Sequence, residues 1–287
     1  MTGDVGLFGP GSVTWKLHQE PILLLGGLRS LYLQALHPRA VTAVAQNSRY
    51  RADPWGRLTR TSAYVGTVVW GTTEEAEAAS LRVRRMHARM TAADPRTGER
   101  FRIDEPDLLR WVHVAEVESF LSTAVRAGVR LTPDEIDGYY TEQLRAAELM
   151  GLDPATVPAT ADEVSAYYDE MLPTLALSRD GLETALFLTV PSVPESWGGR
   201  AFRLGLTLGP TRWAYFGIAA TAMALLPPWA RRLYGGFGLP TTDLTADLSA
   251  RGLRFLLSTV LATIPRSLRV APIREAALAR AAEAAVS

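Results

Sequence analysis

The side chains best suited to metal or redox chemistry in this sequence are four histidines: His18, His37, His87 and His113. Cysteine is absent from the 287 residues. That absence excludes disulfides, thiolate-bound haem, iron–sulfur clusters and cysteine zinc sites. Any metal site must therefore use histidine, carboxylate or tyrosine side chains, and the set of imidazole donors is short and complete.

His87 adjoins the apolar stripe of a helix that we expect over residues 73–90. The apolar positions of this helix recur at spacings of three and four: Ala76, Ala79, Val83, Met86 and Met90. The imidazole should therefore face inward. From the residues alone two interpretations stay open. One is a core histidine bonded to a backbone carbonyl, which is the commoner case, and the other is a metal ligand.

A second polar cluster lies at the preceding expected helix, residues 58–70. Its members fall at i, i+3, i+4 and i+7, which is a single helical face: Arg57, Arg60, Thr61 and Tyr64. Arginine is rarely buried without an anion, so a carboxylate, phosphate or haem propionate partner is one interpretation. The alternative is an exposed face with internal ion pairs, although residues 53–72 contain no acid other than Asp53.

The other three histidines give weaker signals. His113 is expected to be buried in a helix of largely apolar residues, with Glu116 one turn later. A bundle-type di-iron site requires two E-x-x-H motifs, and the chain contains none. His37 precedes Pro38 at a helix junction, where an imidazole more often caps freed carbonyls than binds a metal. His18 lies in the polar stretch WKLHQE and is expected to be exposed.

Composition narrows the class of protein. Thirty basic and 30 acidic residues give no net charge, so no bulk attraction to nucleic acid or to an anionic membrane is available, and no nucleic-acid partner is expected. The sequence has no G-x-S-x-G elbow, dinucleotide fingerprint or phosphate-binding loop. It has no signal-peptide pattern, and its longest nearly apolar run, 213–226, is shorter than the roughly 20 residues of a membrane span. These features predict a cytoplasmic protein without a transmembrane segment.

Helix signals recur along the chain, with very few strand signals between them. A hydroxyl three residues before a glutamate marks helix starts at Thr72, Thr132 and Thr160. Residues 92–104 are expected to form a polar connector. Helices are expected over 22–36, 39–47, 58–70, 73–90, 107–126, 134–150, 163–172, 180–188, 199–226 with a break near 209–210, 244–262 and 267–285.

These patterns predict an all-α fold class. We expect a single globular multi-helix domain over residues 21–287 that encloses a buried cofactor or ligand pocket, preceded by an N-terminal extension over residues 1–20.

Three segments carry a resemblance to a known family. They are LLLGGLRSLYLQALHPRAVTAVAQNSRYRADPWGRLTRT, WGTTEEAEAASLRVRRMHARM and DPRTGERFRIDEPDLLRWVHVAEVESFL. Their ordered motifs HP, R-x-x-R-T, VRRMH and WVH resemble the domain shared by bacterial rubber oxygenases (latex-clearing proteins) and the fungal MpaB oxygenase. The similarity is strong over residues 23–128 and looser toward the C-terminus.

The resemblance implies an all-α fold that holds haem b and activates dioxygen. It also implies oxidative cleavage of carbon–carbon double bonds in an isoprenoid or similar lipophilic chain. By the same resemblance His87 is the proximal haem ligand, which makes a ligand the preferred interpretation of this residue. Arg57, Arg60 and Thr61 match the family's distal segment. His113 is the second choice for the iron.

The sequence departs from the rubber oxygenases in two respects. Those enzymes have a distal lysine that can occupy the iron, whereas this chain has Arg60 there and its only lysine is Lys16. A guanidinium group cannot be deprotonated to serve as such a ligand. The rubber oxygenases also use an upstream glutamate as a base, and residues 21–73 contain no glutamate. Cleavage of rubber itself is therefore not expected.

The sequence thus predicts a haem b-dependent oxygenase or oxidase that acts on a small lipophilic substrate with O₂. The candidate catalytic residues are Arg57, Arg60, Thr61 and Tyr64. The candidate metal ligand is His87, and the candidate cofactor-binding residues are His87, Arg57, Arg60, His113 and His37. Two alternatives remain: a non-catalytic helical protein that binds haem or lipid, and a structural helical protein with an empty apolar pocket. The oligomeric state is open, with a homodimer as one option.

Overall fold

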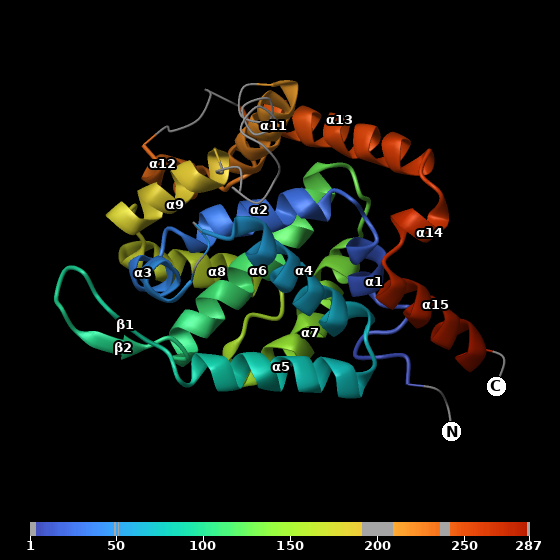
Figure 1. The fold of residues 1–287 in the computed structure, drawn as a ribbon, viewed down its shortest axis with the longest axis horizontal. Helices are drawn as coiled ribbons and strands as arrows, with labels where there is room; N and C mark the ends of the chain where they lie inside the picture. Colours follow the sequence, from blue (N-terminus) through green and yellow to red (C-terminus); the bar gives the residue numbers. More distant parts are fainter. Residues whose placement is uncertain (1–3, 49, 51, 191–208, 236–241, 286–287) are drawn as a thin grey trace.

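Two long helices, α2 (Leu23–Gln34) and α6 (Pro106–Arg126), pack against each other at the centre of the fold (Figure 1). Gly26 lies where they cross. A Cβ atom there would come within 3.1 Å of both the Phe120 ring and the Ser119 carbonyl oxygen, so the missing side chain permits the close approach. Helix α6 buries side chains on several faces, among them Trp111, Ala115 and Leu121. It is therefore surrounded by other helices instead of facing solvent on one side.

The computed structural model describes residues 4–48, 50, 52–190, 209–235 and 242–285. Helices dominate these residues, which confirms the all-α class. Residues 199–208 of one expected helix lie outside the described ranges. The remaining described helices are α1 (Val13–His18), α3 (Pro38–Asn47), α4 (Pro54–Trp70), α5 (Thr73–His87), α7 (Pro133–Leu149), α8 (Ala161–Met171), α9 (Arg179–Thr189), α11 (Pro210–Ala224), α12 (Pro228–Leu233), α13 (Asp243–Ala262), α14 (Arg266–Arg269) and α15 (Pro272–Ala284).

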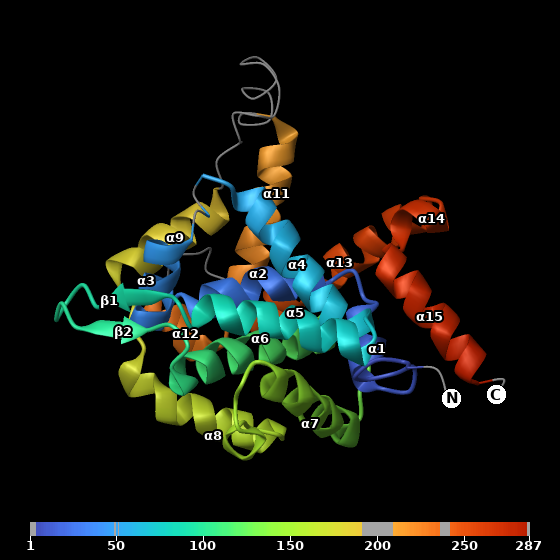
Figure 2. The ribbon, with the colours of Figure 1, turned by 60° about the horizontal axis from the view of Figure 1, so that its bottom comes forward.

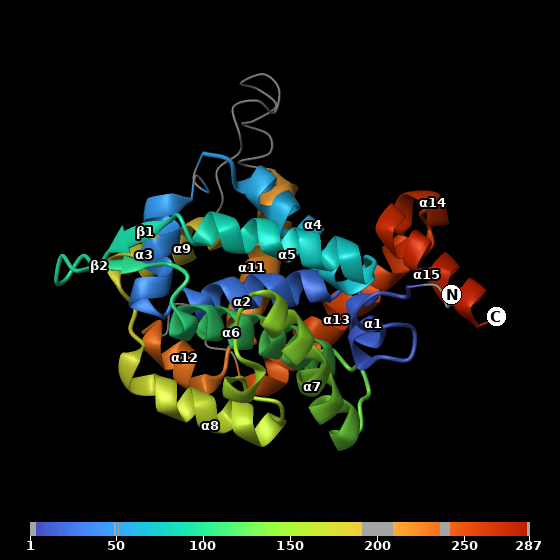
Figure 3. The same ribbon diagram turned by 90° about the horizontal axis from the view of Figure 1, so that it is seen from below.

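Helices α4 and α5 form an antiparallel hairpin that lies over α2 and α6, on the side away from α8 (Figures 2 and 3). The hairpin packs mainly on α15, α1 and α7, and its backbone approaches α2 and α6 at few points. Its turn is fixed by Trp15, whose Nε1 donates to the Val69 carbonyl oxygen at 2.9 Å and whose ring lies 4.8 Å from that of Trp70.

Local capping explains where most helices begin. Thr72 with Glu75 and Thr132 with Glu135 form complete capping boxes at α5 and α7, as the sequence predicts. Helix α4 begins at Pro54, four residues earlier than expected, because the Asp53 carboxylate accepts from the Gly56 amide at 2.9 Å. Proline at the first helical position adds to this start.

Residues 91–102 contain a short β-hairpin that the sequence analysis did not predict. Strands β1 (Thr91–Ala93) and β2 (Arg100–Arg102) pair antiparallel, with Ala92 opposite Phe101. The expectation of a polar connector without strands was wrong, because three-residue strands are too short to show an alternating pattern. Buried Ala92 and Phe101 hold the hairpin against the core, and Gly98 supplies the left-handed turn residue at φ +74°.

The first residues of the chain take part in the core. Leu17 of α1 is fully buried, and the Glu142 carboxylate of α7 accepts from the Val13 and Thr14 amides at 2.9 and 2.8 Å. The Glu142 carboxylate of α7 thus caps the N-terminal end of α1. No described helix combines the length and apolar character needed to cross a membrane.

Candidate active site

His87 is the last residue of α5, and its side chain is half-buried. Its Nδ1 atom is buried and has no hydrogen-bond partner among the described residues. Burial lowers the pKa of His87, although the nearby Asp104 carboxylate opposes this shift. The imidazole is therefore held neutral, which is the form that binds metals, and its hydrogen-bonding capacity is not used by the described chain.

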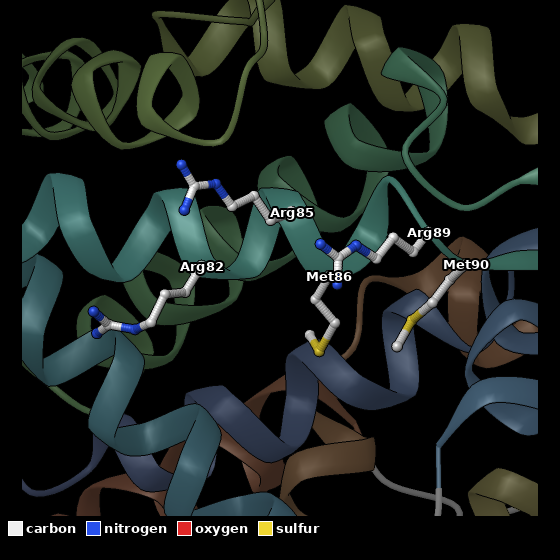
Figure 4. Close-up of a pocket in the computed structure, with 5 residues that line it drawn as sticks. All are labelled: Arg82, Arg85, Met86, Arg89 and Met90. Atoms are coloured by element: carbon white, nitrogen blue, oxygen red, sulfur yellow. The ribbon is translucent and has the colours of Figure 1, made fainter.

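A pocket of about 380 Å³ adjoins the end of α5. Figure 4 shows Met86 and Met90 pointing to one side of the helix and Arg85 to the opposite side. The Met86 side chain is exposed although it is apolar. Flexible thioethers beside cationic side chains provide a surface that could contact an apolar ligand with an anionic edge. The pocket is lined by Arg82, Arg85, Met86, Arg89 and Met90.

The arginines of α4 meet different surroundings. Arg57 is half-buried, and its Nη1 donates to Ser48 Oγ at 2.6 Å. Burial lowers the pKa of Arg57, and no carboxylate pairs with it among the described residues. Arg60 is exposed and pairs with Asp53 at 3.3 Å. Thus the internal ion pair involves Arg60, whereas Arg57 remains available to an anion; Thr61 is exposed beside them.

Tyr64 connects α4 to α5. Its hydroxyl lies 3.2 Å from Ser80 Oγ, and either atom can donate. Burial raises the pKa of Tyr64, the hydrogen bond with Ser80 opposes this shift, and the negative charge of Glu116 raises the pKa further. Burial, followed by the same carboxyl, also raises the pKa of Tyr139 on α7.

His113 and Glu116 share one face of α6. Both side chains are half-buried, and neither makes a hydrogen bond or ion pair with the described residues. Burial lowers the pKa of His113 to about 4 and raises that of Glu116 to about 7. Both side chains are thus strongly desolvated without being completely covered.

His18 packs against side chains of α6 and α7. Its Nε2 lies 3.4 Å from the Tyr139 hydroxyl, and its ring meets Phe120 edge-on at 5.1 Å. Burial lowers the pKa of His18 to about 4. The expectation that His18 is exposed was therefore wrong. Its polar neighbours in the sequence face outward from a short helix whose other side packs on α7.

His37 lies elsewhere. It is the N-cap of α3, where its Nδ1 accepts from the Ala40 amide at 3.3 Å. The sequence analysis expected His37 to cap free carbonyl groups. It caps backbone amides instead, because it lies at the N-terminal end of α3. It lines a separate pocket of about 450 Å³ together with Arg39 and Arg110. The structure thus gives His37 a local role away from His87.

The donor set of the described chain fits a haem. No group of three or more His, Asp or Glu side chains positioned to hold a metal ion is found in the ranges described. A haem brings four nitrogen donors of its own, so the protein needs to supply only an axial ligand. His87 could supply it, and Arg57 could hold a propionate.

A comparison with protein-family models gives one match, to the family described as ER-bound oxygenase mpaB/B'/Rubber oxygenase, catalytic domain. The match covers residues 15–271. This chain belongs to that family. Membership supports an oxygenase, and hence an oxidoreductase. No curated protein and no solved structure matches the chain significantly.

Proposed function

We propose that this chain is a haem b-dependent oxygenase for a small lipophilic, unsaturated substrate, with His87 as the axial ligand of the iron. The observation that carries the proposal is the buried Nδ1 of His87, which has no partner among the described residues. A buried polar atom without a partner costs about 1 to 3 kcal/mol, so its presence calls for an explanation. A ligand bound by the imidazole ring would account for a histidine at this position.

The other side chains have roles that follow from their surroundings. The half-buried Arg57 guanidinium would neutralise a carboxylate at the cofactor edge. The thioethers of Met86 and Met90 would contact the apolar ring or chain and exclude water. Arg60 and Thr61, both exposed, would contact the polar end of a substrate. When bound, haem would supply the activation of dioxygen.

The decisive experiment tests the ligand. We expect protein expressed with a haem precursor to show a b-type Soret spectrum, and His87→Ala to lose this spectrum while its helical circular dichroism is unchanged. The Nδ1 atom of His87 has no hydrogen-bond partner among the described residues, so the substitution breaks no hydrogen bond of that atom. His113→Ala is the matched control, because it removes the other candidate imidazole from the same region.

If His87→Ala keeps the spectrum and His113→Ala loses it, His113 on α6 is the iron ligand instead of His87. Absence of haem from the wild-type protein would reject the haem proposal.

A non-catalytic helical protein that buries haem or lipid is the second candidate, because exposed apolar side chains such as Met86 also suit a carrier. Oxygen uptake by the haem-loaded protein with an unsaturated isoprenoid such as squalene favours the enzyme. Stoichiometric binding of the alkene without oxygen uptake favours the carrier.

A further inference from the structure

Helix α13 exposes apolar side chains along the half that leads to α14 (Figures 1 and 2). Phe255 is 74% exposed, Leu256 57% and Val260 49%, although side chains of these types are usually buried. Leu257 is the last residue of this helix that packs against the main core of the described residues. Several large apolar side chains left uncovered on one element are typical of a surface that meets another apolar phase.

The other half of α13 is fixed to the body of the protein. Arg126 of α6 donates to the Asp247 carboxylate at 2.6 Å, and Arg254 donates to both oxygens of Glu20 at 2.8 and 2.9 Å. Ala250 is fully buried between these two ion pairs. Beyond α14, helix α15 packs against α4. The exposed half is therefore held at both ends and is not a loose terminus.

Basic side chains accompany this apolar surface. Residues 248–274 contain five arginines and no acidic residue, whereas the whole chain has 30 residues of each sign. Arg251 and Arg269 are exposed, and neither forms an ion pair with the described residues. Arg266 is also exposed and meets Glu275 at only 3.7 Å. The segment therefore attracts anions locally, although the chain as a whole carries no net charge.

We infer that this part of the molecule docks on the surface of a lipid bilayer that contains anionic headgroups. We call the docking surface the α13 face and define it by Phe255, Leu256, Val260, Arg266 and Arg269. The apolar side chains enter the boundary between headgroups and acyl chains, and the guanidinium groups remain at the headgroup phosphates. The inference goes beyond the proposed function and does not depend on haem. A lipophilic substrate of the kind proposed above dissolves in the same bilayer.

A second copy of the chain fits the α13 face less well than a lipid surface does. In a two-fold interface the same patch meets itself, so Arg251, Arg266 and Arg269 would lie opposite like charges. Residues 248–274 offer no acidic side chain to pair with them. Headgroup phosphates supply this negative charge, and acyl chains cover apolar side chains without a complementary shape. Charge therefore favours the bilayer.

The first test removes the apolar part of the α13 face. The protein, with or without haem, is sedimented with vesicles of equimolar phosphatidylcholine and phosphatidylglycerol. We expect the wild type to bind and the double variant Phe255→Ser/Leu256→Ser to bind at least about tenfold more weakly, because two apolar side chains no longer leave water. The matched control is Leu81→Ser/Leu186→Ser, which removes two exposed leucines from α5 and α9 and should bind as the wild type does.

The second test removes the charge. Arg266→Gln/Arg269→Gln should bind the same vesicles more weakly, by about fivefold for each arginine, and should be less sensitive to added salt than the wild type. Its binding to vesicles of phosphatidylcholine alone should equal that of the wild type. Arg84→Gln/Arg100→Gln is the control, because it removes two exposed positive charges from α5 and β2. All four double variants change exposed side chains, and circular dichroism checks that they fold.

Two results would overturn the inference. One is a wild-type protein that does not bind the anionic vesicles, or double variants of the α13 face that bind them as well as their controls do. The other is a dimer, detected by light scattering, that dissociates in Phe255→Ser/Leu256→Ser while no form of the protein binds vesicles, which would assign the face to a second copy. Neither measurement depends on bound haem, so the inference and the proposed function fail separately.

Discussion

Glu116 and Glu118 are two residues apart on α6 and have opposite surroundings. Glu118 accepts from Arg29 Nη1 and Nη2 at 2.5 and 3.0 Å and from the Tyr168 hydroxyl at 3.3 Å. Arg29 also donates to Ser119 Oγ at 2.7 Å and to the Leu225 carbonyl oxygen at 2.9 Å. Glu116 has none of these kinds of partner among the described residues, although burial alone raises its pKa to about 7.

This difference distinguishes a carboxylate that stabilises the fold from one that is left unpaired. The Arg29 network, defined as Arg29, Glu118, Ser119, Tyr168 and the Leu225 carbonyl, joins α2, α6, α8 and the end of α11 with its donors and acceptors matched. Such a network is complete within the chain. Glu116, by contrast, has no partner among the described residues, and perturbed, unpaired groups are typical of sites that act on something outside the chain.

The largest expected effect comes from breaking the Arg29 network. Arg29→Met should lower the free energy of unfolding by about 3 to 5 kcal/mol, because it leaves the Glu118 charge buried without its partner. Urea denaturation measures this loss. Arg179→Met is the control, since it removes the exposed Arg179–Glu183 pair and should cost less than about 0.5 kcal/mol. Equal losses in the two variants would contradict a special role for the network.

The next largest effect is a difference between Glu116 and Glu118 in how the free energy of unfolding depends on pH. Because the folded-state pKa of Glu116 is raised from 4.5 to about 7, its contribution to stability is full below pH 4.5 and is lost as pH rises through 7. Glu116→Gln should therefore be more stable than the wild type at pH 8, by about 1 to 3 kcal/mol, with the gain vanishing near pH 4.5. Urea midpoints of the apoprotein across this range check it.

Glu118→Gln should behave differently, because it weakens the pairing with Arg29 and lowers stability at neutral pH. If both substitutions raise stability at pH 8, the pairing of Glu118 with Arg29 does not offset the cost of burying its charge, and the contrast with Glu116 is wrong.

The smallest expected effect concerns Arg57, which is half-buried and, unlike Arg29, has no carboxylate partner among the described residues. Arg57→Leu should change apoprotein stability by less than about 1 kcal/mol, because Arg57 has no carboxylate partner to leave behind. It should increase haem dissociation about tenfold, since a charge-assisted hydrogen bond contributes on the order of 1.5 kcal/mol or more. Haem transfer to apomyoglobin measures the rate. Arg84→Leu, an exposed position on α5, serves as control, and equal rates would remove Arg57 from the site.

Much of the fold could be predicted from the sequence because its signals are local. The capping boxes at Thr72 and Thr132, the proline starts and the apolar spacing determine where helices form. The order of HP, R-x-x-R-T, VRRMH and WVH motifs was enough to suggest the family to which the chain belongs. The β-hairpin at residues 91–102 escaped prediction because its strands are stabilised by the core behind them and not by their own pattern.

The sequence by itself determined the helices, the family and the small set of side chains able to bind a metal. Only the tertiary structure decided which charged groups are matched. Arg29 and Glu118 meet across 89 positions of chain, His18 is buried against α7, and Glu116 has no partner among the described residues. The physical reason is that helix signals depend on neighbours within one turn, whereas burial and pairing depend on helices brought together from distant parts of the chain.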